Sequence, residues 1–144
     1  MSCNENGRCG CQGQDFGKSP LIINMELSAE MNHNYRTAVW TGKYMQVTLM
    51  CIPVGGEIGL EVHEDTDQLL QIVQGSAMVR LGTTRNTVRD AGKIDERFAV
   101  VVPAGTWHNI INCGDKPLKL YSVYAPPHHR FGTVQATRRE AERA

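Results

Sequence analysis

Apolar and polar residues alternate along much of the chain, with the period of two that is typical of β-strands. The clearest case is the segment 44–52. There Met45, Val47 and Leu49 share one face of the predicted strand, while Gln46 and Thr48 lie on the other. Similar short runs recur at even spacing and are rich in apolar and β-branched residues. They predict strands at 21–24, 38–41, 44–52, 57–63, 68–73, 76–81, 98–102, 107–113 and 118–124.

Clusters of glycine and proline separate these runs and predict turns at 54–56, 74–76, 103–105 and 114–117. The polar stretch 82–96 is interpreted as a long hairpin connection, and 28–35 as one helical turn or a loop. Many short strands joined by such turns indicate an all-β domain, either a sandwich or a barrel. We place this barrel at residues 20–125.

The two ends of the chain differ from this pattern. Residues 1–19 are rich in Gly, Asn, Gln and Ser, which predicts a flexible N-terminal tail. Its cysteines, Cys3, Cys9 and Cys11, are either a soft-metal or redox cluster or incidental thiols. The lack of a CxxC pair and of a fourth ligand favours incidental thiols. Residues 126–144 are a C-terminal extension, with a short helix predicted by the capping-box spacing of Thr137 and Glu140.

Length and charge narrow the function classes. A chain of 144 residues fits one domain and can bury a core without disulfides. Lys and Arg number 15, as do Asp and Glu, and this balance argues against nucleic-acid or anionic-membrane partners. No apolar run is long enough to span a bilayer, and the N-terminus has no apolar signal segment. We therefore expect a cytoplasmic protein.

Side chains that can ligate a metal lie on neighbouring predicted strands. Glu61 and His63 are two residues apart, so a strand directs both to the same face. Gln68 begins the next predicted strand, and a hairpin can return it to the same wall. A Pro–Gly turn at 103–105 then delivers His108 to the start of another strand.

These two segments resemble the two sequence motifs of the cupin superfamily. The first motif is matched at the family's spacing by Gly55, Glu61, His63, Gln68 and Gly75, and the second by Pro103, Gly105, His108 and Asn112. Arg97 stands where the second motif usually begins with Gly. The resemblance implies an antiparallel jelly-roll barrel that forms a homodimer. It also implies that Glu61, His63, Gln68 and His108 bind one metal.

Two of these ligand positions depart from the family pattern, because Glu61 replaces a His and Gln68 replaces a Glu. The total ligand charge is still minus one, since the carboxylate has moved and has not been lost. Two imidazoles and a carboxylate suit one divalent transition metal, which could be Fe, Mn, Ni or Zn. The neutral amide of Gln68 is the weakest donor. Glu61 is also the candidate catalytic base. With a metal the alternative base is a bound hydroxide, and without one Glu61 and His63 are both candidates for acid–base work.

The candidates for binding a substrate are Tyr44, Gln46, Thr48, Tyr124 and His128. Gln46 and Thr48 occupy the polar face of their strand, and the two tyrosines are aromatic residues that can line a cavity. His128 follows a Pro–Pro pair. Together with His129 it either folds over the barrel mouth, to hold substrate or a second metal, or lies in an exposed turn.

Two classes of function stay open. The first is a metal-dependent enzyme acting on a small organic molecule, of dioxygenase, isomerase or lyase type. A sugar-phosphate isomerase would need phosphate-binding cations, for which Arg80, Arg85 and Arg89 are available. The second is a non-catalytic module that binds or senses a metabolite, with or without a metal.

Overall fold

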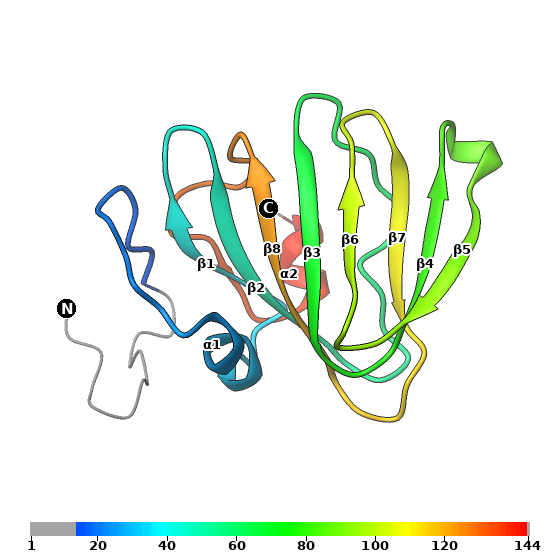
Figure 1. The fold of residues 1–144 in the computed structure, drawn as a ribbon, viewed down its shortest axis with the longest axis horizontal. Helices are drawn as coiled ribbons and strands as arrows, with labels where there is room; N and C mark the ends of the chain where they lie inside the picture. The colour runs from blue at the N-terminus through cyan, green and yellow to red at the C-terminus, as the bar shows by residue number, and fades with distance from the viewer. Residues whose placement is uncertain (1–13, 144) are drawn as a thin grey trace.

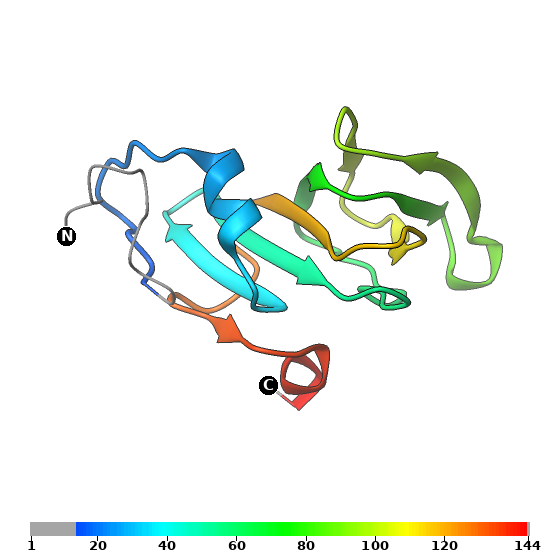
Figure 2. The same ribbon diagram turned by 90° about the horizontal axis from the view of Figure 1, so that it is seen from below.

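A computed structural model describes residues 14–143 of the protein. The chain forms two antiparallel sheets joined by turns and flanked by two short helices (Figures 1 and 2). The elements are α1 (Met25–Met31), β1 (Arg36–Thr41), β2 (Gln46–Ile52), β3 (Asp67–Gln74), β4 (Ala77–Gly82), η1 (Arg85–Thr87), β5 (Arg89–Ile94), β6 (Ala99–Val102), β7 (Trp107–Asn112), β8 (Leu118–Ala125), β9 (Val134–Gln135) and α2 (Arg138–Arg143). The all-β, antiparallel jelly-roll prediction is confirmed.

The order of strands brings distant segments of the chain together. The larger sheet has the order β6-β3-β8-β2-β1-β9, and the smaller has the order β5-β4-β7. In the larger sheet β8 lies between β2 and β3, so the last long strand pairs with two early ones (Figure 1). Metal-ligand candidates on β3 and β7 therefore belong to different sheets.

Alternation along the strands divides the interior into an apolar end and a polar end. On β2, Met50 and Ile52 point inward with Leu118 and Leu120 of β8 opposite them, and all four are fully buried. Further along the same face of β2 come Gln46 and Thr48, which are also fully buried. The apolar end supplies the main hydrophobic core, and the polar end holds the functional candidates.

The outer face of the larger sheet is covered in part by α1. Ala29 of this helix packs with Val47 and Leu49 of β2 in a second apolar cluster. The helix begins at Asn24, whose side-chain oxygen accepts a hydrogen bond from the Leu27 amide at 3.0 Å. The predicted strand 21–24 was wrong, because its last residue caps this helix and the segment joins neither sheet.

Two other segments differ from the expectations. The predicted strand 57–63 meets β7 only at two bridges, Glu57 with Ile111 and Glu61 with His108. It is interrupted at Gly59, which has a φ of 102°. The stretch 82–96 is more ordered than a loop, since it contains η1 and the strand β5.

The C-terminal segment packs back onto the barrel. β9 pairs with β1, which extends the larger sheet beyond residue 125. The predicted short helix is present as α2, and the Thr137 hydroxyl accepts a hydrogen bond from the Glu140 amide at 3.2 Å. The predicted tail cysteines lie outside the described residues. Within residues 14–143, no helix is long and apolar enough to cross a bilayer.

Candidate metal centre

Glu61 and His108 are held opposite each other by paired backbone hydrogen bonds. The amide of each donates to the carbonyl of the other, at 3.0 and 2.9 Å. From Glu57 to Glu61 the loop advances four residues while β7 advances three, so the loop contains one extra residue. This bulge lies at Gly59, whose amide donates to the Asn109 side chain at 2.9 Å. The extra residue changes which side of the segment each following side chain lies on, and so directs Glu61 toward His108.

His63 is fixed by the turn that precedes β7. The Gly105 amide donates to the His63 carbonyl at 2.8 Å, which docks the turn 103–105 against the Glu61–His63 segment. Gly105 has a φ of 82°, a conformation that glycine adopts without strain. The Pro–Gly turn of the sequence therefore positions both histidines, one through its backbone and one by starting β7.

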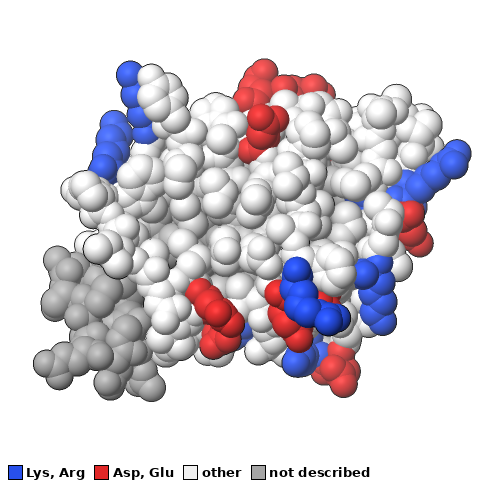
Figure 3. Space-filling view, viewed as in Figure 1, with Lys and Arg blue, Asp and Glu red and all other residues white. Residues whose placement is uncertain are grey.

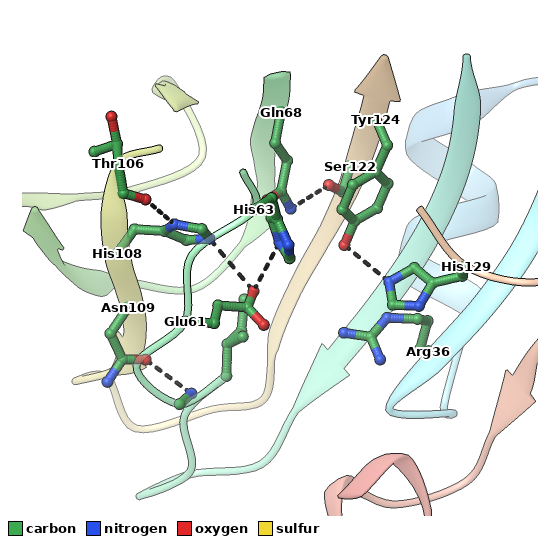
Figure 4. Close-up of polar contacts among 12 residues, drawn as sticks. Arg36, Glu61, His63, Gln68, Thr106, His108, Asn109, Ser122, Tyr124 and His129 are labelled. Atoms are coloured by element: carbon green, nitrogen blue, oxygen red, sulfur yellow. Dashed lines mark hydrogen bonds and ion pairs between the residues drawn. The ribbon is translucent and has the colours of Figure 1, made fainter. Parts of the chain in front are cut away.

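Three donor atoms converge inside the barrel (Figure 4). Glu61 Oε1 lies 3.3 Å from His63 Nε2 and 3.3 Å from His108 Nε2. All three atoms lie within 4.8 Å of one another. Charge-assisted hydrogen bonds are shorter, at about 2.7–2.9 Å. The 3.3 Å spacing instead equals the edge of a tetrahedron around an ion with ligand bonds of about 2.0–2.1 Å.

The hydrogen bonds around these donors leave their metal-binding atoms free. His108 Nδ1 lies 2.9 Å from the Thr106 carbonyl, which favours the tautomer with a proton on Nδ1 and a lone pair on Nε2. Both Nε2 atoms are buried and, apart from the 3.3 Å contacts with Glu61, have no partner. The donor set therefore fits a divalent transition metal, since an ion would satisfy both orphaned nitrogens.

The Gln68 side chain is also oriented by a hydrogen bond that leaves a possible metal-binding atom without a partner. Its side chain is buried, and its Nε2 donates to Ser122 Oγ at 2.8 Å. This bond directs the amide so that Oε1 is buried without a partner (Figure 4). An unpartnered buried carbonyl oxygen is costly, and a metal would satisfy it as a fourth ligand.

Charge at the centre favours an ionised carboxylate. Burial raises the pKa of Glu61, but contacts with His108 and His63 outweigh it and hold that pKa well below its usual range. Burial lowers the pKa of His108, yet Glu61 and the Thr106 carbonyl together raise it. Glu61 thus supplies one negative charge to the interior.

His128 and His129 close over this centre. The His128 ring is exposed on one side and lies 4.1 Å from the His63 ring, measured between centroids. The segment is held by Gln46, whose Oε1 accepts the amides of both histidines at 3.2 and 2.8 Å. Gln46 Nε2 donates to the His129 carbonyl and to Thr41 Oγ1. With its amide fully used, Gln46 positions the segment and has no free group for a substrate.

Tyr124 and Thr48 both face the interior. Tyr124 is fully buried, and its hydroxyl lies 3.3 Å from His129 Nε2. Burial raises the pKa of Tyr124, so its phenol stays neutral. The Thr48 hydroxyl is buried and has no hydrogen-bond partner. Both side chains therefore lie in the polar end of the interior, and their contact with a substrate stays a prediction.

Tyr44 and the three predicted cations lie elsewhere. Tyr44 is 72% exposed in the turn between β1 and β2, because its turn projects away from the interior. Arg80 pairs with Asp90 of β5, and Arg85 stacks over Trp107 on the outer side of β7. Arg89 is exposed on β5. The structure brings none of them to the cluster.

Arg36 was missed by the sequence analysis. It lies on β1 opposite Met50, so its side chain points into the barrel, where Figure 4 shows it beside His129. The predicted strand began at Ala38. Extending the alternation back by two residues would have placed Arg36 on the same inward face as Ala38.

The family model described as the Cupin domain matches residues 48–124, which hold Glu61, His63, Gln68 and His108. The chain belongs to the cupin family. This confirms the resemblance inferred from the two motifs.

Proteins of similar sequence or structure include three informative cases. The uncharacterized protein YrkC of Bacillus subtilis is 48% identical over 128 residues, which cover 89% of this chain and 69% of YrkC. The crystal structure of BH2720 from Bacillus halodurans has a TM-score of 0.90 and 44% identity, covering 91% of this chain and 99% of that one. An oxalate decarboxylase from Lactobacillus farciminis, in a formate complex, has a TM-score of 0.54 and 25% identity, covering 60% of this chain and 25% of that one.

The two positions that depart from the family pattern are held by different strands. The carboxylate that the family pattern places at position 68 comes here from position 61, across from His108. Gln68 keeps its place on β3 and is held by Ser122. The donors therefore converge although the carboxylate comes from a different strand position.

Proposed function

We propose that this cupin binds one divalent transition metal, Fe, Mn, Ni or Zn, and uses it as an enzyme acting on a small organic molecule. Glu61, His63 and His108 would hold the ion, and Gln68 would add a weaker oxygen donor. The observation that carries the proposal is the convergence of the Glu61 carboxylate on two buried imidazole nitrogens that have no other partner. A bound metal would supply Lewis-acid polarisation of a substrate oxygen.

The chain's own residues divide the remaining work. Glu61 stays ionised, and a carboxylate whose pKa is held so low is a better ligand than proton acceptor. His128 is better suited to move a proton, because burial first, and then His63, lower its pKa and keep its ring neutral. It stands at the opening, next to His63. The catalytic role predicted for Glu61 would then be to set the charge of the centre.

The reaction type is narrowed by the position of the cations. A sugar-phosphate isomerase needs several positive side chains at its substrate. Arg80, Arg85 and Arg89 lie outside the cluster, and of the arginines discussed Arg36 alone points into the barrel. The likeness to an oxalate decarboxylase supports the lyase type, and two imidazoles with one carboxylate also suit a dioxygenase. We therefore place lyase and dioxygenase ahead of isomerase.

A metal-free binding module is the second candidate. It is favoured by one observation, which is that Glu61 already contacts both imidazoles. If both histidines share a proton with Glu61, the carboxylate and the two imidazole nitrogens are paired without an ion. The barrel would then hold or sense a metabolite.

Metal content decides between the two. The full chain, purified without a tag or added metal, is analysed for metals before and after reconstitution with each ion. We expect about one equivalent in the wild type, nearly none in His63→Ala and His108→Ala, and weaker binding in Gln68→Ala. His33→Ala is the matched control, since His33 is exposed in a loop. Equal occupancy in all these variants, or none in the wild type after reconstitution, would exclude the metal site.

We also propose that two copies pair through the larger sheet. Leu69 of β3 lies between Val101 of β6 and Val123 of β8 on the outer face, and Val101 is 66% exposed. Figure 3 shows a face whose charged side chains lie near its margins, while its centre is uncharged. Exposed apolar surface of this kind is typical of interfaces. Light scattering of the full chain would give the mass of a dimer, and the mass of one chain would refute the pairing.

A further inference from the structure

Arg36 carries a buried charge with no anionic partner. The residue is only 5% exposed, and no carboxylate in residues 14–143 forms an ion pair with it. Its Nη1 donates to Gln135 Oε1 at 2.7 Å, and its guanidinium lies 5.1 Å from the Tyr35 ring centroid. Its Nε is buried with no hydrogen-bond partner. These neutral contacts leave the charge uncompensated, which is unfavourable unless an anion joins it.

The guanidinium faces the same interior as the metal-ligand cluster. Figure 4 shows it below Tyr124 and His129, on the side toward Glu61. Burial first, and then Arg36 and His128, lower the pKa of His129 to about 3, while Glu61 acts in the opposite direction. The register agrees with this placement, because Arg36 is opposite the inward-facing Met50 of β2, the strand whose Gln46 holds the His128–His129 segment.

A second unsatisfied group is a diagonal neighbour of Arg36 on the inward face of the sheet. Ala38 is opposite Thr48, and on β1 it is two residues from Arg36 on the same face. Thr48 Oγ1 is buried without a partner, and Ala38, which is opposite Thr48, carries only a methyl group. A guanidinium and a hydroxyl together offer the donors that the two oxygens of a carboxylate accept.

Charge also favours an acid. A divalent ion at the cluster, with Glu61 and Arg36, leaves the interior with two net positive charges. A substrate that brings negative charge would offset them. A phosphate would require several cations, whereas Arg36 is the buried guanidinium that faces this part of the described chain.

We propose that Arg36 recognises the carboxylate of a small organic acid inside the barrel, with Thr48 as a second donor. The acid would direct another oxygen to the metal centre, as a 2-oxo acid, a 2-hydroxy acid or a small dicarboxylate can. This second contact rests on the proposed metal function, whereas the pairing with Arg36 does not.

The test is calorimetric titration of the full chain with pyruvate, lactate and malonate, each compared with its neutral amide, and with inorganic phosphate. Metal content is measured in the same samples. We expect each acid to bind at least tenfold more tightly than its amide. Arg36→Met should weaken acid binding at least tenfold, which is about 1.4 kcal/mol, and leave amide binding unchanged. Arg36→Lys should fall between, and Arg89→Met, an exposed control on β5, should match the wild type.

The outcomes separate recognition from structure. If Arg36 only supports the fold, Arg36→Met loses stability but keeps the wild-type ratio of acid to amide affinity, and the proposal is overturned. Equal binding of acid and amide, or tighter binding of phosphate, also overturns it. If Arg36→Met does not fold, Arg36→Lys and Thr48→Val must each lower acid affinity for the proposal to stand.

A failure of the metal site leaves this test intact. If the protein holds no metal, the proposed metal function fails, and the same titrations are run on the metal-free chain. Acid binding that depends on Arg36 then supports recognition without a metal. No acid binding, or binding that Arg36→Met leaves unchanged, refutes it.

Discussion

Replacing Gln46 with methionine should release the His128–His129 segment from the barrel. The Gln46 amide is fully buried and makes four hydrogen bonds: it accepts the amides of His128 and His129 and donates to the His129 carbonyl and Thr41 Oγ1. Methionine is of similar length and fills the same space, but it can form none of these bonds. The segment would keep only the contact between His129 Nε2 and the Tyr124 hydroxyl at 3.3 Å among the side-chain bonds described here.

The size of the effect follows from the number of bonds. A hydrogen bond contributes about 0.5–1.5 kcal/mol net, so removing four costs about 2–6 kcal/mol. The segment lies at the surface, where His128 is exposed, so its freed amides can bind water. We therefore expect a loss of about 2–3 kcal/mol in the free energy of unfolding. A domain of typical stability would remain folded after this loss.

Urea denaturation of the wild type and Gln46→Met measures the loss, with the slope m unchanged. Hydrogen exchange at the His128 and His129 amides should become much faster in the variant. Gln74→Met is the control, because Gln74 makes one hydrogen bond, to the Pro117 carbonyl at the surface. A loss below about 0.5 kcal/mol, with exchange at both amides unchanged, would refute this role of Gln46.

Two further predictions concern the bulge and the pH dependence. Gly59→Ala should lower the free energy of unfolding by about 1–3 kcal/mol and weaken metal binding. The reasons are that Gly59 has a φ of 102° and that a Cβ there would lie 2.7 Å from Arg138 Nη2. Thermal melts and metal titrations that match those of Gly92→Ala, an unhindered control, would contradict this prediction. In the folded protein His129 has a pKa of about 3, whereas in the unfolded chain it titrates near 6.5. The contribution of the neutral ring to stability is therefore complete above about pH 6.5 and is lost as the pH falls toward 3. The loss is at most about 2 kcal/mol at pH 5, since partial exposure screens it. Urea midpoints at pH 7 and pH 5 should therefore differ less in His129→Gln than in the wild type, and equal differences would rule this out.

The sequence was informative where local pattern decides the structure. Alternation on the segment 44–52 correctly separated Gln46 and Thr48 from their apolar neighbours, because the period of a strand depends only on its backbone. The spacing of the two motifs correctly predicted that Glu61, His63 and His108 lie together, because each motif contains its own turn. Whether these residues bind a metal stays a prediction.

The errors have a common physical origin in tertiary context. Tyr44 belongs to an alternating run, but the run turns away from the barrel before β2 begins at Gln46. The bulge at Gly59 breaks a strand-like sequence, and only the pairing with β7 reveals it. The role of Gln46 could not be predicted either, because its partners at 128–129 lie more than eighty residues away. Arg36 required the strand to begin two residues earlier than its apolar pattern indicated.

The register of the larger sheet explains how one interior supports both a core and a reactive centre. Gln46 of β2 and Gln68 of β3 both pair with Tyr124 of β8, so polar residues meet polar residues across three strands. Four residues further along β2, Met50 pairs with Leu120, and apolar residues meet in the same way. Because the two ends are separated along the strands, the apolar end can stabilise the barrel while the polar end keeps orphaned donors. A shift of one residue in the pairing of β8 would turn both sets outward and abolish core and centre together.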